Sequence, residues 1–145
     1  VEVVFACGGG IYTSAAEAAA KVDGKVIGVD SDQAPIIDAY GEGMTVTSAM
    51  KGLAPTVNTL LSAIVLDDTW GDYVGKIDNL GLVSDNPEEN YVQLPLESTQ
   101  WNDGFTEDDY KALVADIESG KVTVDNSIDA MPETTITVND LGNIK

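Results

Sequence analysis

The sequence predicts an α/β fold with a small parallel sheet flanked by helices, and two observations lead to this prediction. First, short apolar runs at residues 1–7 and 25–29 enclose an alanine-rich stretch at residues 12–22. A strand, a helix and a second strand in this order make a βαβ unit, whose strands run parallel with a right-handed connection. Second, the chain has 145 residues, enough for one compact domain with a buried core.

Residues at the boundaries of this first unit support the assignment. A triple glycine follows the first strand and is expected to form a loop. Thr13 or Ser14 is placed to cap the amino end of the helix, and Gly24 is placed to stop it. The second strand then leads directly into a pair of aspartates.

A third strand and a second helix follow. After a loop that contains Pro35, residues 44–48 form the predicted strand. Pro55 stands where a first-position proline is favoured, and it opens a helix that extends to about residue 66. One face of this helix is apolar, and it is formed by Val57, Leu60, Leu61 and Ile64.

The pattern changes in the second half of the chain. Residues 77–83 and 91–95 have the composition of short extended segments. Thr106, with Asp109 three positions later, predicts the start of a final helix, which Gly120 ends.

We assign residues 1–124 to one lobe and residues 125–145 to a carboxy-terminal tail. Within the tail, residues 125–133 are predicted to form a loop, and residues 134–138 an edge strand or part of a frayed end. The chain opens in strand-like sequence without an initiator Met. We therefore expect it to be part of a longer protein, with upstream segments, including any signal, missing.

The composition excludes several classes of function. The formal net charge is −18, with seven lysines, no arginine and no histidine. Such a surface repels nucleic acid, because phosphate binding requires basic side chains that displace counterions, and it disfavours direct docking on an anionic membrane. The lack of histidine removes the commonest general base. The single cysteine, Cys7, lies in an apolar strand and is expected to be a buried structural thiol.

Two carboxylates one residue apart, Asp30 and Asp32, end the second strand. In parallel α/β sheets ligands bind at the carboxyl ends of the strands, so these residues are the first candidates for a site. Three functions fit them: accepting hydrogen bonds from the adjacent hydroxyls of a sugar or ribose, holding Mg²⁺ or Ca²⁺, or acting in a phosphatase. A fourth interpretation is that they only cap the turn.

The Asp-x-Asp string resembles the nucleophile motif of the Mg²⁺-dependent phosphatases of the haloacid dehalogenase type. That family has Thr or Val two residues after the second Asp, where this chain has Ala34. Its motif also follows the first strand of the core, not the second. The phosphatase, with Asp30 as nucleophile and Asp32 as acid, is therefore kept as an alternative.

Two further features are predicted at the same edge of the sheet. Gly8, Gly9 and Gly10 allow a ligand to approach the backbone closely. They complete neither the dinucleotide-binding pattern nor the P-loop pattern, so we interpret the loop as a flat floor for a ring-shaped ligand. Lys51 follows the third strand and is expected to pair with Asp30 or to reach the ligand.

Taken in series, several strings resemble one known family. They are residues 3–10, 15–21, 27–33 and 46–51, of which the Gly-Val-Asp-Ser-Asp-Gln string is the most specific. In this order they resemble the carboxy-terminal half of the basic membrane lipoprotein family, the purine-nucleoside-binding lipoproteins of bacterial ABC importers. Residues 79–82 and 117–122 also resemble that family, so the resemblance covers most of residues 1–124. The family often has Gly-Gly-Thr-Gly-Asn-Gly where this chain has Gly-Gly-Gly-Ile-Tyr-Thr.

The resemblance implies one lobe of a type I periplasmic-binding-protein fold, in which two α/β lobes close on a ligand. It implies that Asp30 and Lys51 hold the ribose hydroxyls of a nucleoside, while Gly8, Gly9 and Gly10 lie against it. It also implies a non-catalytic, extracytoplasmic protein that needs no cofactor or metal. A lipid on the missing amino-terminal region would anchor it to the membrane beside an ABC permease.

Several expectations accompany this assignment. Asp32 is a further ligand-binding candidate, but we expect it chiefly to shape the turn beneath Asp30. Tyr12 is a local candidate for stacking on the base, and the missing amino-terminal lobe would supply the rest. Without that lobe, the chain is expected to bind ligand poorly. Its exposed apolar face is expected to produce a dimer or a domain-swapped form. A sugar receptor of the same fold is the second alternative.

Overall fold

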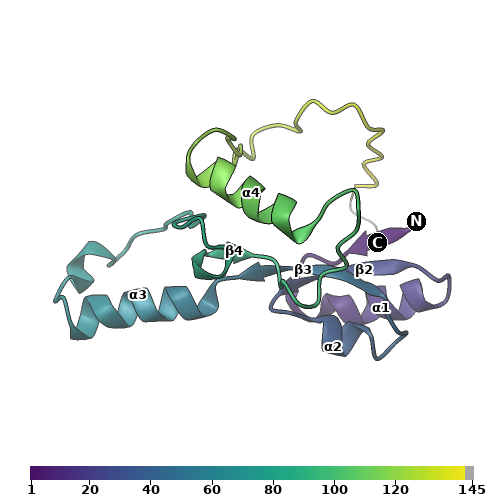
Figure 1. The fold of residues 1–145 in the computed structure, drawn as a ribbon, viewed down its shortest axis with the longest axis horizontal. Coiled ribbons are helices and arrows are strands. Elements are labelled where there is room, and N and C mark those ends of the chain that lie inside the picture. The colour runs from purple at the N-terminus through teal and green to yellow at the C-terminus, as the bar shows by residue number, and fades with distance from the viewer. Residues whose placement is uncertain (143–145) are drawn as a thin grey trace.

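The structure is a computed structural model, and it describes residues 1–142. Its centre is a four-stranded sheet in the order β1-β2-β3-β4 (Figure 1), formed by β1 (Val3–Phe5), β2 (Lys25–Asp30), β3 (Thr45–Lys51) and β4 (Val92–Gln93). The first three strands are parallel, whereas β4 pairs antiparallel with β3. The predicted α/β class with a small, mostly parallel sheet is therefore confirmed.

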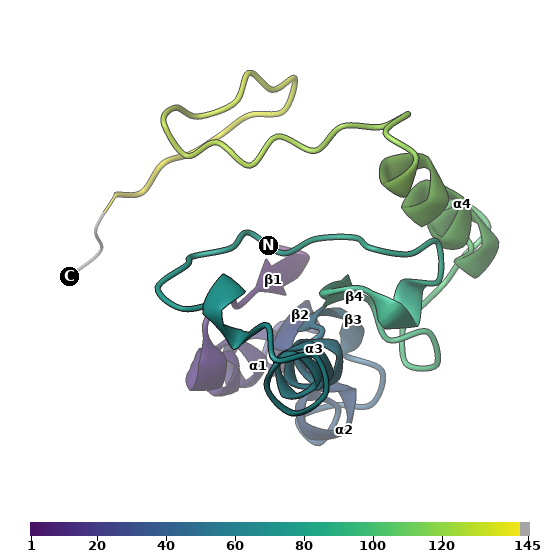
Figure 2. The ribbon, with the colours of Figure 1, turned by 90° about the vertical axis from the view of Figure 1, so that its left-hand side faces the viewer.

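Helices lie on both sides of this sheet. They are α1 (Tyr12–Ala20), α2 (Ala34–Ile37), α3 (Leu53–Val65) and α4 (Glu107–Glu118). Figures 1 and 2 show α1, α2 and α3 on one side of the sheet, and α4 with the carboxy-terminal segment on the other. The part of the chain that the structure describes also contains three short 3₁₀ turns, at Gly9–Ile11, Trp70–Asp72 and Pro87–Glu89.

The core lies between the sheet and the first two helices. It contains Ala16, Ala19, Val26, Ile37 and Met44, with Tyr12 packed against it. Small alanines on one face of α1 let the helix approach β2 closely, while Val26 and Ile37 are completely buried. This packing stabilises the βαβ unit that the sequence predicts, because burial of apolar area is the main favourable term in folding.

The first βαβ unit differs from the prediction at its boundaries. The first strand covers three residues instead of seven. Neither Thr13 nor Ser14 caps α1, because a 3₁₀ turn over Gly9–Ile11 precedes the helix and Ile11 occupies the capping position. The Thr13 hydroxyl instead donates to the carbonyl of Gly10, at 3.0 Å.

Three more expectations need correction. The stretch expected to be a loop around Pro35 contains the short helix α2. Pro55 is the third residue of α3, which begins two residues earlier than predicted. Cys7 is exposed and not buried, because the strand ends two residues before it.

The second half of the chain has less regular structure than its sequence suggests. Residues 77–83 form no strand, and only two residues of the segment 91–95 do so. The final helix α4 is as predicted at its start, where Thr106 and Asp109 form a reciprocal capping box. Its end is also as predicted, because Gly120 has a left-handed φ of 77° just beyond it.

The tail is irregular as far as the structure describes it. Residues 125–133 form no helix or strand, as predicted, and residues 134–138 do not form the expected edge strand. The last part of the predicted tail, residues 143–145, lies outside the described residues. Within residues 1–142, no helix combines the length and the apolar character that crossing a membrane requires.

Candidate functional site

An ion pair joins the carboxyl ends of the two central strands. The Lys51 ammonium nitrogen Nζ lies 2.7 Å from Oδ1 of Asp30. Asp30 is the last residue of β2 and Lys51 the last residue of β3, and the two strands are neighbours in parallel register. The structure therefore brings together the two residues that the sequence singled out at this edge.

The backbone of Asp30 is unusual for a residue other than glycine. Its φ is 70°, in the left-handed region, which Asp and Asn adopt more readily than most residues. This conformation ends the strand abruptly, and the amide of Ser31 donates back to the carbonyl of Val29 at 2.8 Å. The chain thus turns away immediately after Asp30 and leaves its carboxylate one-third exposed at the sheet edge.

The electrostatics of the pair follow from this contact. The hydrogen bond to Asp30, and then the negative charge of Asp30, raise the pKa of Lys51 above its ordinary value. Slight desolvation opposes this shift, and the nearby Cys7 adds a small contribution that raises the pKa further. Lys51 therefore remains a cation at neutral pH. Since the pair is largely exposed to water, it contributes little to stability.

The glycine loop lies at the carboxyl end of β1, beside β2 in the same sheet. The amide of Ile11 donates to the carbonyl of Gly8 at 3.0 Å, which curls the loop into its 3₁₀ turn. Apart from the adjoining residues, no atom of residues 1–142 lies within 4 Å of the position that a Cβ would occupy at Gly9 or at Gly10. The backbone at these two glycines therefore faces open space, which a flat ligand would need in order to approach it.

Asp32 is bonded within the protein and does not contact the ion pair. Its Oδ1 accepts a hydrogen bond from the amide of Ala34 at 3.0 Å, which makes a tight turn before α2. Its Oδ2 accepts a hydrogen bond from the Ser98 hydroxyl at 2.8 Å. Both carboxylate oxygens therefore hold backbone segments together, which is the structural role expected for this residue.

A buried polar arrangement beneath the turn was not predicted. The amide of Val29 donates to Oε1 of Gln33, and the amide of Gln33 donates to the Ser48 hydroxyl, at 3.0 and 3.1 Å. Gly28 makes room for both side chains, since a Cβ there would lie 2.5 Å from the Ser48 oxygen. These bonds fix the strand end that carries Asp30.

On the other side of the ion pair, Gly52 anchors the second half of the chain. Its amide donates to the carbonyl of Tyr91 at 2.8 Å. A Cβ at Gly52 would lie 2.7 Å from the Cα of Tyr91, so only glycine lets the two backbones approach this closely. This contact places β4 beside the end of β3, and thus next to Lys51. A glycine directly after a strand was the only sequence signal for it.

Two cavities lie elsewhere on the molecule. The larger, with a volume of about 500 Å³, lies between β4 and α4, and the smaller, of about 250 Å³, lies beside α3. Neither of these two cavities is lined by Asp30, Lys51 or the glycine loop. Within residues 1–142, no cluster of three or more acidic, histidine or cysteine side chains has a geometry that would hold a metal ion.

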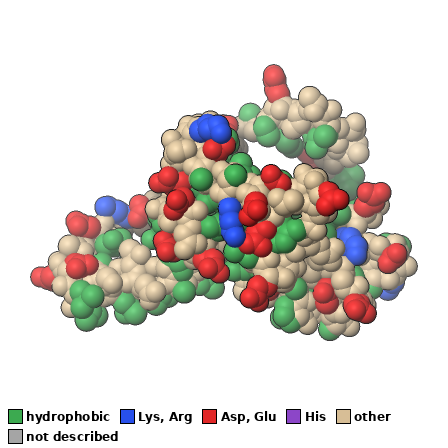
Figure 3. Space-filling model, in the orientation of Figure 1, with side chains coloured by type: hydrophobic (Ala, Val, Ile, Leu, Met, Phe, Trp, Pro, Cys, Tyr) green, Lys and Arg blue, Asp and Glu red, His purple; other side chains and the backbone are tan. Residues whose placement is uncertain are grey.

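The surface of the molecule is acidic. Figure 3 shows many carboxylates and few lysines on the face that it draws, in line with the net charge of −18. Lys51 is therefore one of few cations that a ligand could contact on this protein. Its ion pair with Asp30 holds that positive charge at the edge of the sheet.

Comparisons with known proteins give no family for this chain. No protein-family model matches it, and neither a curated protein nor a solved structure shows significant similarity to it. The fold and the geometry of the Asp30–Lys51 edge are therefore the structural observations from which a function is proposed.

Proposed function

We propose that this chain is one lobe of an extracytoplasmic solute-binding lipoprotein that delivers a nucleoside to an ABC importer. The observation that carries the proposal is the contact between Lys51 Nζ and Asp30 Oδ1 at the carboxyl edge of the sheet, beside the glycine loop. The specific ligand class and the transport role come from the resemblance to the basic membrane lipoproteins.

The chemistry of the pair suits a vicinal diol, such as the two hydroxyls of a ribose. A carboxylate only accepts hydrogen bonds, and an ammonium group only donates them. The ion pair with Lys51 is formed through Oδ1 of Asp30, and Oδ2 is the oxygen that would accept a hydrogen bond from a hydroxyl proton. Lys51 uses one of its three N–H groups to bind Asp30, and another can donate a hydrogen bond to a hydroxyl oxygen of the ligand.

The surroundings support a flat ligand beside this pair. The backbone at Gly9 and Gly10 is open, in the loop that follows β1, the strand next to β2. A sugar ring or base would approach the backbone at these two glycines, with the exposed Ile11 side chain beside Gly8. Both oxygens of Asp32 are bonded within the protein, which favours the binding role for Asp30 over a two-carboxylate catalytic mechanism.

Titration calorimetry of the two-lobed protein with a purine ribonucleoside tests the proposal. We predict that Asp30→Ala weakens binding at least tenfold, because a hydrogen bond to a charged group contributes about 1.5–3 kcal/mol. Asp68→Ala is the matched control: Asp68 also has a left-handed φ, of 51°, but lies outside the sheet edge, and its removal should leave affinity unchanged.

Two ligand comparisons complete this test. A 2′,3′-dideoxynucleoside, which lacks the diol, should bind the unmodified protein as weakly as the ribonucleoside binds Asp30→Ala. Free ribose should bind more weakly than the ribonucleoside. Equal affinity for ribose would instead identify a sugar receptor, and unchanged ribonucleoside affinity in Asp30→Ala would overturn the site itself.

A further inference from the structure

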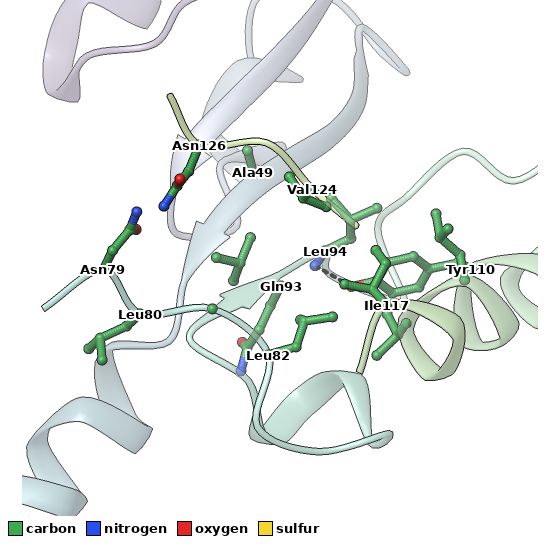
Figure 4. A pocket seen from close by; sticks show the side chains of 14 residues that line it. Ala49, Asn79, Leu80, Leu82, Gln93, Leu94, Tyr110, Ile117, Val124 and Asn126 are labelled. Atoms are coloured by element: carbon green, nitrogen blue, oxygen red, sulfur yellow. Dashed lines mark hydrogen bonds between the residues drawn. The ribbon is translucent and has the colours of Figure 1, made fainter. Parts of the chain in front are cut away.

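The larger cavity lies between two parts of the chain that are distant in sequence (Figure 4). Its volume is about 500 Å³, within the range of about 300–1,000 Å³ that is common for small-molecule sites. One wall comes from α4, and the opposite walls come from the edge of the sheet and residues 79–82. The segment around Val124 passes over it and partly closes it.

The lining of the cavity is almost entirely apolar. Leu113, Val114 and Ile117 project from one face of α4, and Leu82 and Leu94 lie across from them. None of the side chains that line it, within residues 1–142, carries a charge. An ion would lose its hydration there without gaining a partner, so the lining favours an uncharged ligand.

One buried hydroxyl in this cavity has an unused donor. Tyr110 is only 8% exposed, and its phenolic oxygen accepts a hydrogen bond from the amide of Leu94 at 3.1 Å. Within residues 1–142, the phenolic proton itself has no acceptor. Buried polar hydrogens are rarely left without a partner, because each one costs free energy in an apolar environment. Burial also raises the pKa of the Tyr110 phenol, so the proton is retained at neutral pH.

The opposite end of the cavity is polar. Asn79 and Asn126 point toward one another in Figure 4, from the loop before β4 and from the carboxy-terminal segment. Each side-chain amide is able both to donate and to accept hydrogen bonds. The cavity thus has an apolar centre, one phenolic donor within it and two amides at its mouth. A third amide in its lining, that of Gln93, already donates to the carbonyls of Glu88 and Asn90.

We propose that this cavity is a second binding site, for an uncharged and largely apolar molecule that carries a carbonyl or hydroxyl oxygen. The oxygen accepts the hydrogen bond from the Tyr110 hydroxyl, and the apolar body packs between α4 and β4. The site does not include Asp30 or Lys51, so it stands independently of the nucleoside proposal.

The neutral dye Nile red is a suitable probe, because it is apolar, fits this volume and has one carbonyl oxygen. We expect it to bind the full chain with one-to-one stoichiometry and to quench the fluorescence of Trp101, whose ring centroid lies 5.7 Å from that of Tyr110. Leu113→Trp, which fills the cavity from its partly exposed rim, should weaken binding at least tenfold. Tyr110→Phe removes only the hydroxyl and should weaken binding about three- to tenfold.

Matched controls distinguish the cavity from other apolar surfaces. Leu61→Trp makes the same change on the exposed face of α3, and Tyr91→Phe removes a hydroxyl that lies outside this cavity. Neither should change the affinity. Circular dichroism verifies that each variant folds. If Leu113→Trp does not fold, the Nile red affinity of Tyr110→Phe tests the proposal by itself. Affinity that Tyr110→Phe leaves unchanged, or that Leu61→Trp reduces, overturns the proposal.

Discussion

The first third of the chain and the remainder are held together by different means. In residues 1–52, five buried side chains form one apolar cluster between the sheet and its helices. In α3, by contrast, Val57, Leu61 and Ile64 are each about half exposed, and Ala63 is its only buried residue. Figure 3 shows apolar side chains gathered along the lower side of the part of the molecule that contains this helix.

What holds the second region is a set of polar anchors. Asn90 is completely buried and makes four hydrogen bonds, accepting from the amides of Val83 and Ser84 and donating to two carbonyls. These bonds hold the loop before β4 in its folded shape, and the close approach at Gly52 attaches it to the end of β3. The loop before β4 is thus ordered by hydrogen bonds to its backbone amides and carbonyls, and not by burial of apolar side chains.

The largest effect is expected in the apolar cluster. Ile37→Ala should lower the free energy of unfolding by about 2–5 kcal/mol, because Ile37 is fully buried and the change leaves a cavity. Leu61→Ala on α3 is the control, and in the monomer it should change stability by no more than about 0.5 kcal/mol. Urea denaturation measures both values.

The same control also tests self-association. A dimer formed through an exposed apolar face would cover the apolar face of α3, where Leu61 lies. In that case Leu61→Ala would shift light scattering toward the monomer and would lower stability in a concentration-dependent way. Monomeric behaviour at all concentrations would contradict the proposed dimer and would leave the contrast between the two regions intact.

An intermediate effect is expected at Asn90. Asn90→Ala removes the partner of two amides and two carbonyls, and should destabilise by about 1–3 kcal/mol. Hydrogen exchange should show the loss of protection around Val83 and β4, while β2 stays protected. Asn58→Ala, on the exposed surface of α3, is the control. Equal loss of protection in β2 would show that the two regions unfold as one unit.

The smallest effect on stability is expected at the ion pair. Asp30 raises the pKa of Lys51 in the folded state, so the pair stabilises the fold at pH values below the ordinary value of 10.5. That stabilisation is lost as the pH rises through the raised pKa. The difference in unfolding free energy between the unmodified protein and Asp30→Asn should therefore be constant from pH 7 to 9 and shrink above about pH 10.5. A difference that grows with pH would contradict the assignment.

The sequence predicted the elements of the first region better than most of those in the second. The βαβ unit and the capping box of α4 were predictable, because apolar periodicity and capping residues act over a few neighbouring positions. The expected strands at residues 77–83 and 134–138 do not form, since a strand requires a partner that local sequence does not specify. The exposure of Cys7 was missed for a related reason: the strand that would bury it ends at Phe5.

Local sequence was sufficient to select Asp30 and Lys51, because each ends an apolar strand and parallel strands end at one edge. Only the folded chain shows that their side chains meet at 2.7 Å while both oxygens of Asp32 are engaged elsewhere. The same is true of the apolar cavity, whose walls come from residues 49 to 126. Contacts between segments so distant in sequence depend on packing and loop closure, which no short pattern encodes.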